Sequence, residues 1–326
     1  MSAKIIDGKE IAANVRAELK EKVAALGNQG ISVTLAVVLV GENPASKVYV
    51  RNKIRACEEC GIINKEILLP ETASEEELLA KVDELNADPS VNGILVQLPL
   101  PSHMDEDRVI RRIDPKKDVD GFHPESVGAL SIGLPGFVSC TPAGIIQLLH
   151  REGIVCDGKE CVIVGRSNIV GKPMGMLMLR ENATVTHAHS HTKDLKEVCR
   201  RADILITAIG KPRFFNHEYV RKGAVVIDCG INRDENGKLC GDVDTEDVME
   251  TAGAVTPVPG GVGPMTIAML MKVSCWDGCL RRTLWRAERE RSTSSNDCVC
   301  YKEERGCQAH YYDLQRQECK CLTDDF

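Results

Sequence analysis

The segment PASKVYVRNKIRACEECG places a tyrosine and a lysine, Tyr49 and Lys53, four positions apart in what the sequence predicts to be a helix. Asn43 can cap the first turn, Pro44 suits the first helical position, and Gly61 suits the left-handed residue that ends a helix. Side chains four residues apart project from one face of a helix. The pair therefore presents a flat aromatic ring and a proton-carrying amine to one place, unless both simply face solvent.

A glycine-containing loop, VIVGRSNIVGKP at 162–173, follows an apolar strand and opens a helix. At such a turn, backbone N–H groups and a helix N-terminus can bind the pyrophosphate of a dinucleotide. The glycines are Gly165 and Gly171, which departs from the usual G-x-G-x-x-G spacing. A merely tight strand–helix connection is the alternative.

The end of the next predicted strand indicates which dinucleotide is used. It reads THAHSHT, without the acidic residue that an NAD-preferring site places on the ribose 2′-hydroxyl. Arg166 and Ser190 suit a 2′-phosphate instead, which favours NADP. His187, His189 and His191 alternate here, but no matching cysteine or carboxylate cluster accompanies them, so we predict no metal site.

Three further segments carry polar groups or a stiff backbone. Gln97 stands at the carboxyl end of the apolar run VNGILVQLPLP, where α/β folds bind ligands, although a glutamine can also simply cap a strand. Asp120 lies in the acidic turn KKDVDGFHP, where an aspartate can equally be a turn residue. The run TPVPGGVGPMT at 256–266 predicts a stiff loop that could lie flat against a planar ligand.

Alternating strands and helices must position these groups. Apolar runs predict strands at 33–41, 91–101, 159–165, 183–189, 202–210 and 223–230, with a weaker one at 63–70. Helical patterns fall at 9–26, 44–60, 74–88, 143–150, 171–182 and 194–203. This alternation predicts an α/β fold with parallel sheets, and the pattern restarts after a boundary near 120–141. We expect two α/β domains, 1–140 and 141–272.

Length and composition narrow the class of protein. The chain of 326 residues is long enough for two domains, and its 43% hydrophobic content supports genuine cores. A net charge of -7 disfavours nucleic-acid binding. No apolar run approaches the roughly 18 residues needed to cross a bilayer, and the start lacks a signal-peptide pattern. We expect a cytoplasmic protein that binds neither membrane nor nucleic acid.

The ordered motifs S-x-x-Y-x-x-x-K, V-Q-L-P-L-P, K-D-V-D-G-F, G-R-S-x-x-V-G-x-P and P-G-G-V-G-P-M-T resemble those of the bifunctional methylenetetrahydrofolate dehydrogenase/cyclohydrolase family, the FolD type. The resemblance covers residues 1–272. It implies oxidation of 5,10-methylenetetrahydrofolate to the 5,10-methenyl form with NADP, then hydrolysis to 10-formyltetrahydrofolate. It also implies a homodimer, with a cleft between an N-terminal catalytic, folate-binding domain and a Rossmann-like NADP-binding domain.

The resemblance also implies roles for individual residues. Lys53 looks like the acid/base of the hydrolytic step, and desolvation would lower the pKa of its amine toward that task. Gln97 would orient Lys53, Tyr49 would lie against the pterin or aminobenzoate ring, and Asp120 would accept hydrogen bonds from the pterin. The remaining implied ligand contacts are Leu98, Pro259, Gly260 and Gly261 for the folate, and Gly165, Arg166, Ser167, Ser190 and Ile231 for NADP.

Three alternatives remain open. Short-chain dehydrogenases also use Y-x-x-x-K, but there the pair follows the nucleotide loop, whereas here it precedes it. A monofunctional dehydrogenase of the same fold is disfavoured by the presence of Lys53, Gln97 and Asp120. The third alternative is a non-catalytic scaffold that keeps an NADP domain.

The last part of the sequence, 273–326, departs from the family pattern. It holds seven of the fifteen cysteines and both tryptophans, and the other cysteines lie mostly in apolar segments, where they look structural. By ligand count, zinc could be bound by Cys298, Cys300, Cys307, His310, Cys319 and Cys321, but the spacings match no zinc module. We interpret 273–326 as an aberrant or alternative C-terminus that forms a disordered tail.

Overall fold

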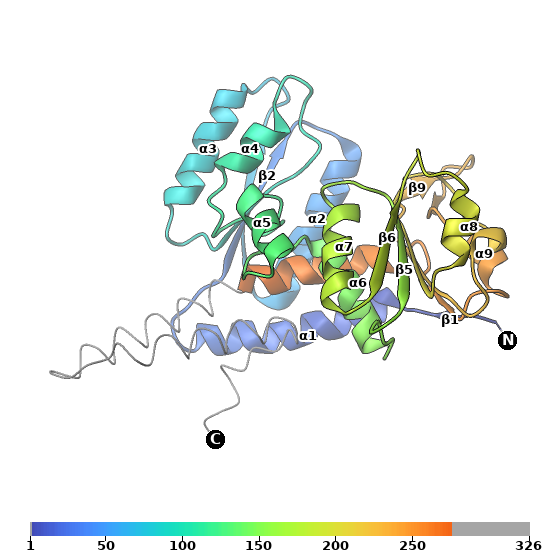
Figure 1. Cartoon of the computed structure of the whole chain (residues 1–326). Coiled ribbons are helices and arrows are strands. Elements are labelled where there is room, and N and C mark those ends of the chain that lie inside the picture. The colour runs from blue at the N-terminus through green and yellow to red at the C-terminus, as the bar shows by residue number, and fades with distance from the viewer. Residues whose placement is uncertain (1, 276–326) are drawn as a thin grey trace.

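The computed structural model describes residues 2–275 of the chain, and these residues form two α/β units (Figure 1). The first unit is built on a parallel sheet of three strands in the order β3-β2-β4. Its elements are β2 (Thr34–Val40), α2 (Pro44–Cys60), β3 (Ile63–Leu69), α3 (Glu75–Ala87), β4 (Gly93–Val96), α4 (Glu106–Arg112) and α5 (Pro124–Ile132). Every residue of β2 is buried because this strand lies between the other two and is covered on both faces.

The second unit is built on a parallel sheet of six strands in the order β1-β11-β8-β7-β5-β6. Its strands are β1 (Lys4–Ile5), β5 (Glu160–Val164), β6 (Thr184–Ala188), β7 (Ile204–Thr207), β8 (Val225–Asp228) and β11 (Ala254–Val255), and a separate hairpin is formed by β9 (Asn232–Arg233) and β10 (Leu239–Cys240). Its helices are α6 (Cys140–Arg151), α7 (Gly171–Arg180), α8 (Leu195–Arg200), the 3-10 turn η1 (His217–Tyr219) and α9 (Thr245–Val248). The parallel α/β architecture expected from the sequence is therefore present in both units.

The N-terminal strand was not expected in the second sheet. Lys4 and Ile5 pair with Ala254 and Val255, so the chain begins in the second unit before it enters the first. The long helix α1 (Gly8–Gly27) then runs along the base of the molecule (Figure 1). Its apolar side chains are buried, as the spacing at 9–26 predicts. The domain division at residue 140 remains a prediction.

One hydrophobic core joins the two units. It contains buried side chains from α1, β2, α2, α6, β5 and α7 together with those of the last described helix, 262–275. The guanidinium of Arg151 on α6 also makes two hydrogen bonds of 2.8 Å with the carboxylate of Glu18 on α1. Helix 262–275 ends against the first unit, where the Cys275 thiol lies near those of Cys57 and Cys60 on α2. Residues 273–275 continue this helix, so the prediction of a disordered tail from 273 is wrong for these three residues. The rest of that interpretation, for 276–326, lies outside the described residues.

No helix within residues 2–275 is both long and apolar enough to cross a membrane.

Candidate active site

The Lys53 side chain lies half-buried on α2, one turn after Tyr49. Asn43 begins this helix by accepting a hydrogen bond of 3.2 Å from the N–H of Ser46, and Gly61 ends it with a φ of 76°. The Lys53 ammonium donates a hydrogen bond of 2.9 Å to Oε1 of Gln97. The ring of Tyr49 is 38% exposed and therefore accessible to a ligand.

Gln97 is held by the sheet and by its own loop. Its backbone N–H bonds to the carbonyl of Val38 at 2.8 Å, which continues the ladder beyond β4. Its side-chain amide N–H bonds to the carbonyl of Leu98. Because the amide nitrogen is engaged on that side, the amide oxygen faces Lys53.

Burial and opposite charge act against each other at Lys53 and Asp120. Burial lowers the pKa of the Lys53 amine below its usual value, while the nearby Asp120 carboxylate raises it in part. Burial likewise raises the pKa of Asp120 to about 6, with Lys53 opposing and Asp118 reinforcing the change. The site therefore favours a neutral amine more than bulk water does.

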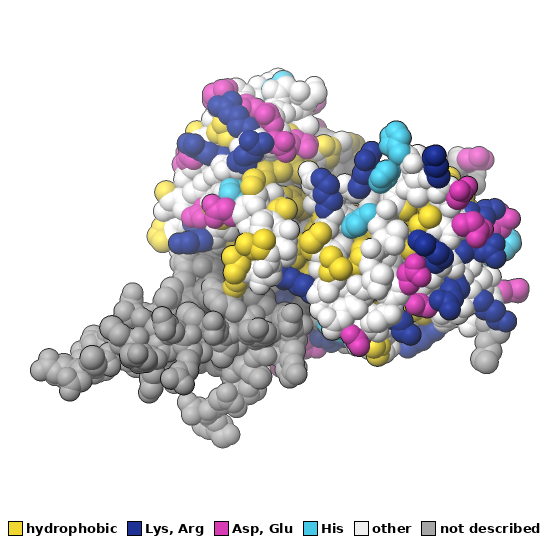
Figure 2. Space-filling view, viewed as in Figure 1, with side chains coloured by type: hydrophobic (Ala, Val, Ile, Leu, Met, Phe, Trp, Pro, Cys, Tyr) yellow, Lys and Arg dark blue, Asp and Glu magenta, His cyan; other side chains and the backbone are white. Residues whose placement is uncertain are grey.

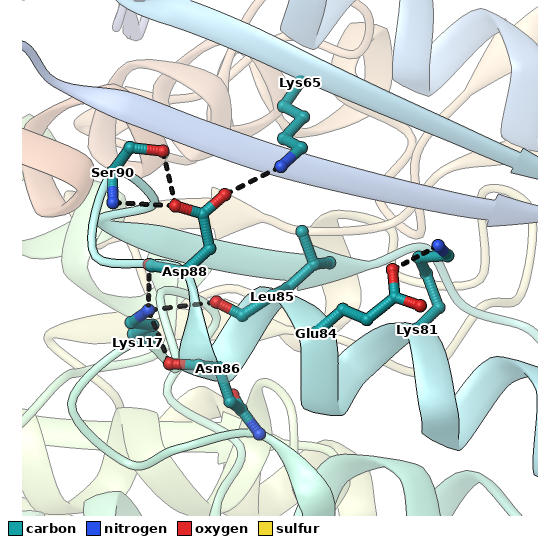
Figure 3. A network of polar contacts seen from close by, with 8 residues as sticks. All are labelled: Lys65, Lys81, Glu84, Leu85, Asn86, Asp88, Ser90 and Lys117. Atoms are coloured by element: carbon teal, nitrogen blue, oxygen red, sulfur yellow. Dashed lines mark hydrogen bonds and ion pairs between the residues drawn. The ribbon is translucent and has the colours of Figure 1, made fainter.

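The turn that carries Asp120 is anchored at its start by a buried lysine (Figure 3). The ammonium of Lys117 donates to three backbone carbonyls at the C-terminal end of α3, those of Leu85, Asn86 and Asp88, at 2.8 to 2.9 Å. The carbonyl of Lys117 in turn accepts a hydrogen bond from the N–H of Ile94 on β4. Asp120 therefore stands on a segment fixed to both α3 and β4.

A carboxylate and a glycine hold the far side of this turn. The Asp118 carboxylate accepts hydrogen bonds from the N–H of His123 at 2.8 Å and from the hydroxyl of Ser126 at 2.9 Å. Gly121 adopts a φ of 68°, and a Cβ there would lie 2.7 Å from the N of Ser139. Of these anchoring contacts, the sequence indicated only the acidic turn itself.

Cys140 and Ser139 connect this cluster with the nucleotide loop. The Cys140 thiol is buried beside Lys53 and Asp120 and donates to the carbonyl of Val119 at 3.4 Å. The hydroxyl of Ser139 donates to the carbonyl of Ile169 at 2.6 Å. The neighbouring residues Ser139 and Cys140 therefore connect the loop 165–170 with the cluster around Lys53, and sequence reasoning missed this link.

In the loop between β5 and α7, two glycines allow backbone segments to pack unusually close to one another. Gly165 has a φ of 138°, and a Cβ there would lie 2.5 Å from the carbonyl oxygen of Ala208. A Cβ on Gly171 would lie 2.4 Å from the carbonyl oxygen of Gly165. The hydroxyl of Ser167 accepts hydrogen bonds from the N–H groups of Val170 and Gly171, which holds the turn that leads into α7.

The other predicted cofactor residues are exposed. They are Arg166 after β5, Ser190 after β6 and Ile231 beside β9. Figure 2 shows histidine and basic side chains gathered on the second unit where it faces the first. His187 packs closely on α7, since a Cβ on Gly175 would lie 2.1 Å from its Nε2.

The P-G-G loop packs on the start of α1. A Cβ on Gly8 would lie 1.8 Å from the carbonyl oxygen of Gly261, so the two backbones touch. Gly260 has a φ of 115° beside the side chain of Lys9, while Pro259 is exposed. Within the described residues, no side-chain hydrogen bond or ion pair joins this loop to Lys53.

Two family models match consecutive parts of the chain. The catalytic domain of tetrahydrofolate dehydrogenase/cyclohydrolase matches residues 6–120, and the NAD(P)-binding domain of the same enzymes matches residues 139–277. The chain belongs to this family. Its function is accordingly that of a tetrahydrofolate dehydrogenase and cyclohydrolase with an NAD(P)-binding domain.

Individual relatives agree with this membership. A bifunctional protein FolD of Lachnoclostridium phytofermentans is 65% identical over 269 residues, which is 82% of this chain and 95% of that protein. The crystal structure of the bifunctional FolD enzyme from Campylobacter jejuni superposes with a TM-score of 0.85 at 49% identity, covering 86% of this chain and all of that one. A Trypanosoma brucei FolD structure, complexed with NADP and an inhibitor, gives a TM-score of 0.83 at 36% identity over 87% of this chain and 99% of its own.

Proposed function

We propose that the cyclohydrolase step, the hydrolysis of 5,10-methenyltetrahydrofolate to the 10-formyl form, uses Lys53 as its acid/base. The observation that carries this proposal is the 2.9 Å hydrogen bond between the half-buried Lys53 amine and Gln97, with Asp120 close by. Burial lowers the pKa of this amine, so more of it is neutral near neutral pH than of a solvated lysine.

Hydrolysis removes both protons from the attacking water and returns one of them to a ring nitrogen. The neutral Lys53 amine takes a proton from the water that attacks the methenyl carbon, and a C–O bond forms. The resulting ammonium gives that proton to the ring nitrogen as its C–N bond breaks. The oxygen loses its second proton to solvent as the C=O bond forms, so the ring opens to the neutral formyl product and one proton is released. Gln97 accepts one amine N–H and so directs the amine's lone pair toward the substrate.

The oxidation step depends on alignment rather than on proton transfer. Bound NADP supplies a nicotinamide ring that accepts the hydride from the methylene carbon. The chain's task is to hold two flat rings face to face. We assign Tyr49, Leu98 and the P-G-G loop of Pro259, Gly260 and Gly261 to the folate, and the charged Asp120 to the pterin's amide N–H and amino groups.

The loop between β5 and α7 fits a dinucleotide phosphate. At Gly165 and Gly171 any side chain would meet backbone, so the loop leaves its N–H groups open to a close approach. Arg166 is exposed in this loop, Ser190 follows β6, and the first acidic residue after β6 is Asp194. A cation and a hydroxyl without a competing carboxylate favour the 2′-phosphate of NADP over NAD.

The cofactor preference is tested by Arg166→Gln. We expect kcat/KM with NADP to fall by about tenfold or more and kcat/KM with NAD to change little, because only NADP loses a charged contact. Arg200→Gln on α8 is the matched control, since this exposed arginine pairs with Glu197 away from the loop. An equal loss with both cofactors would exclude the assignment.

The activities are tested on the purified chain by two separate assays. One follows NADPH formation from 5,10-methylenetetrahydrofolate, and the other follows disappearance of added 5,10-methenyltetrahydrofolate without cofactor. We expect both reactions. NADPH formation without hydrolysis would identify a monofunctional dehydrogenase, and neither reaction would identify a non-catalytic scaffold.

We also propose a homodimer that forms along β3. This strand has β2 on one side only, and its exposed apolar side chains include Ile63 (52% exposed) and Leu68 (63% exposed). Oδ1 of Asn64 on the same strand is buried without a hydrogen-bond partner among the described residues. An edge strand with apolar side chains and open backbone groups suits a second copy of the chain.

Sedimentation of Leu68→Asp tests the dimer. We expect the unsubstituted chain to sediment as a dimer at micromolar concentration and the variant as a monomer. Leu179→Asp on α7, which removes a leucine of 52% exposure from another face, should remain dimeric. A monomeric unsubstituted chain would contradict the proposal.

We place the protein in the cytoplasm. The cysteines of residues 2–275 are unpaired thiols, and all but Cys229 are buried, which suits a reducing compartment.

A further inference from the structure

A buried carboxylate, that of Asp242, organises the loop that follows β7. Asp242 is 0% exposed and lies just after β10. Its Oδ2 accepts hydrogen bonds from the N–H groups of Ile209 at 2.6 Å and Gly210 at 3.2 Å, and its Oδ1 accepts one from the N–H of Lys211 at 2.9 Å. Three successive backbone donors beyond the end of a strand thus converge on one side chain.

The same carboxylate holds a second loop, the one that follows β8. The side-chain amide of Asn232 donates to Oδ1 of Asp242 at 2.9 Å. A Cβ on Gly230 would lie 2.5 Å from that oxygen, so the backbone of this loop packs directly on the carboxylate. Ile231, which the family resemblance assigns to the cofactor, lies between these two residues and is 53% exposed.

Asp242 is itself held in place by Asp228, the last residue of β8. The Asp228 carboxylate accepts hydrogen bonds from the N–H of Asp242 at 3.0 Å, from that of Val243 at 2.9 Å and from that of Gly230 at 2.8 Å. The segment that presents Asp242 therefore cannot shift without breaking contacts to the sheet. The two carboxylates tie together the loops after β7 and β8 and the segment after β10.

These loops stand at the carboxyl ends of β7, which is next to β5, and of β8, which is next to β7. The loop that follows β5 is the proposed phosphate site. In a parallel α/β sheet, ligands bind at this edge. The loop after β7 also touches the phosphate loop, since a Cβ on Gly165 would lie 2.5 Å from the oxygen of Ala208. The far end of a dinucleotide bound at Gly165 would therefore meet the loops that Asp242 holds.

We infer that Asp242 is a positioning residue for hydride transfer: it holds the loops 209–211 and 230–232 in the shape that receives the nicotinamide half of the cofactor. The inference rests on the cofactor site proposed above, and Asp242 itself touches neither ligand. An aspartate is needed because its two oxygens accept four hydrogen bonds. An asparagine of the same size would turn an N–H donor toward other donors.

Loss of Asp242 should separate the two activities of the enzyme. Hydride transfer requires the two rings to be aligned, and a displacement of about 1 Å can cost about 100-fold in rate. Hydrolysis uses Lys53 on α2 and needs no nicotinamide. A purely structural role of Asp242 would instead reduce both activities together, because both use the same folded cleft.

The experiment compares Asp242→Asn with the unsubstituted full-length chain. We expect kcat/KM for NADP in the dehydrogenase assay to fall about 100-fold, while hydrolysis of added methenyltetrahydrofolate without cofactor keeps its rate. Asp234→Asn is the matched control. Asp234 accepts hydrogen bonds from the N–H groups of Asn236 and Lys238 in the turn between β9 and β10, and its loss should leave both activities unchanged.

Asn232→Ala tests the positioning role of Asp242 if Asp242→Asn does not fold. This substitution removes one hydrogen bond to Asp242 from a half-buried side chain. A loss confined to the dehydrogenase, seen as a raised KM for NADP, supports the inference. Equal losses in both activities, or no loss in the dehydrogenase, would overturn it.

Discussion

Replacement of Lys53 by glutamine should remove hydrolysis and spare oxidation. Glutamine keeps much of the side-chain length and can still hydrogen-bond Gln97, but it cannot exchange a proton at neutral pH. Proton transfer by a positioned group contributes about 10²- to 10⁴-fold to a rate. We therefore expect the cyclohydrolase rate of Lys53→Gln to fall by that factor, or by about 3 to 5 kcal/mol of barrier.

The assay must keep Asp120 ionised in both proteins. The positive charge of Lys53 lowers the pKa of Asp120, so its loss moves that pKa above about 6. Both activities should therefore be measured at about pH 8, well above the pKa of Asp120. At that pH the dehydrogenase rate of the variant should stay close to that of the unsubstituted chain.

A second lysine on α2 provides the control. Lys47 pairs with Glu42 at the start of the helix, and Lys47→Gln should change neither activity. Normal hydrolysis by Lys53→Gln would refute the acid/base role. An equal loss of both activities would show that Lys53 binds folate rather than transferring a proton.

Three further predictions follow from the contacts around the site. As pH falls through about 6, protonation of Asp120 should raise KM for folate in both activities, because the carboxyl loses acceptor capacity; pH profiles of KM test this. Gly8→Ala should lower the free energy of unfolding by about 2 kcal/mol, since its Cβ would lie 1.8 Å from the Gly261 oxygen. Gly27→Ala, with open space around its Cβ, should raise it by about 0.5 to 1 kcal/mol in the same urea titrations. Lys117→Met should lower it by about 3 kcal/mol, because three carbonyls lose a charged donor, and an unchanged urea midpoint would contradict this.

Much of the fold could be predicted because its strands are buried on both faces. The apolar runs at 33–41, 159–165 and 223–230 contain β2, β5 and β8, and such runs are typical of parallel sheets. The strands β1 and β11 could not be predicted in this way. Each has two residues, too few for any periodicity, and they pair across almost the whole described chain.

The candidate site was only partly predictable for a similar reason. Lys53 and Gln97 are 44 residues apart, and the motifs indicated both as site residues before the structure placed them together. Lys117 and Asp242 gave no such signal, because most of their partners are backbone groups 29 to 33 residues away. Because every residue offers the same backbone groups, residue types in the sequence do not show which backbone groups a polar side chain will bind.

The central claim is that burial gives the Lys53 amine a pKa low enough for it to act as a base. The pH dependence of cyclohydrolase kcat/KM tests this most directly, because that parameter reports the ionisation of the free enzyme. We predict two inflections as the rate rises with pH: that of Asp120 at about 6, and that of Lys53 at an apparent pKa below the ordinary lysine value of about 10.4. Only the Lys53 inflection should be missing in Lys53→Gln. A Lys53 inflection at the ordinary lysine pKa, or an unchanged pair of inflections in Lys53→Gln, would contradict the account.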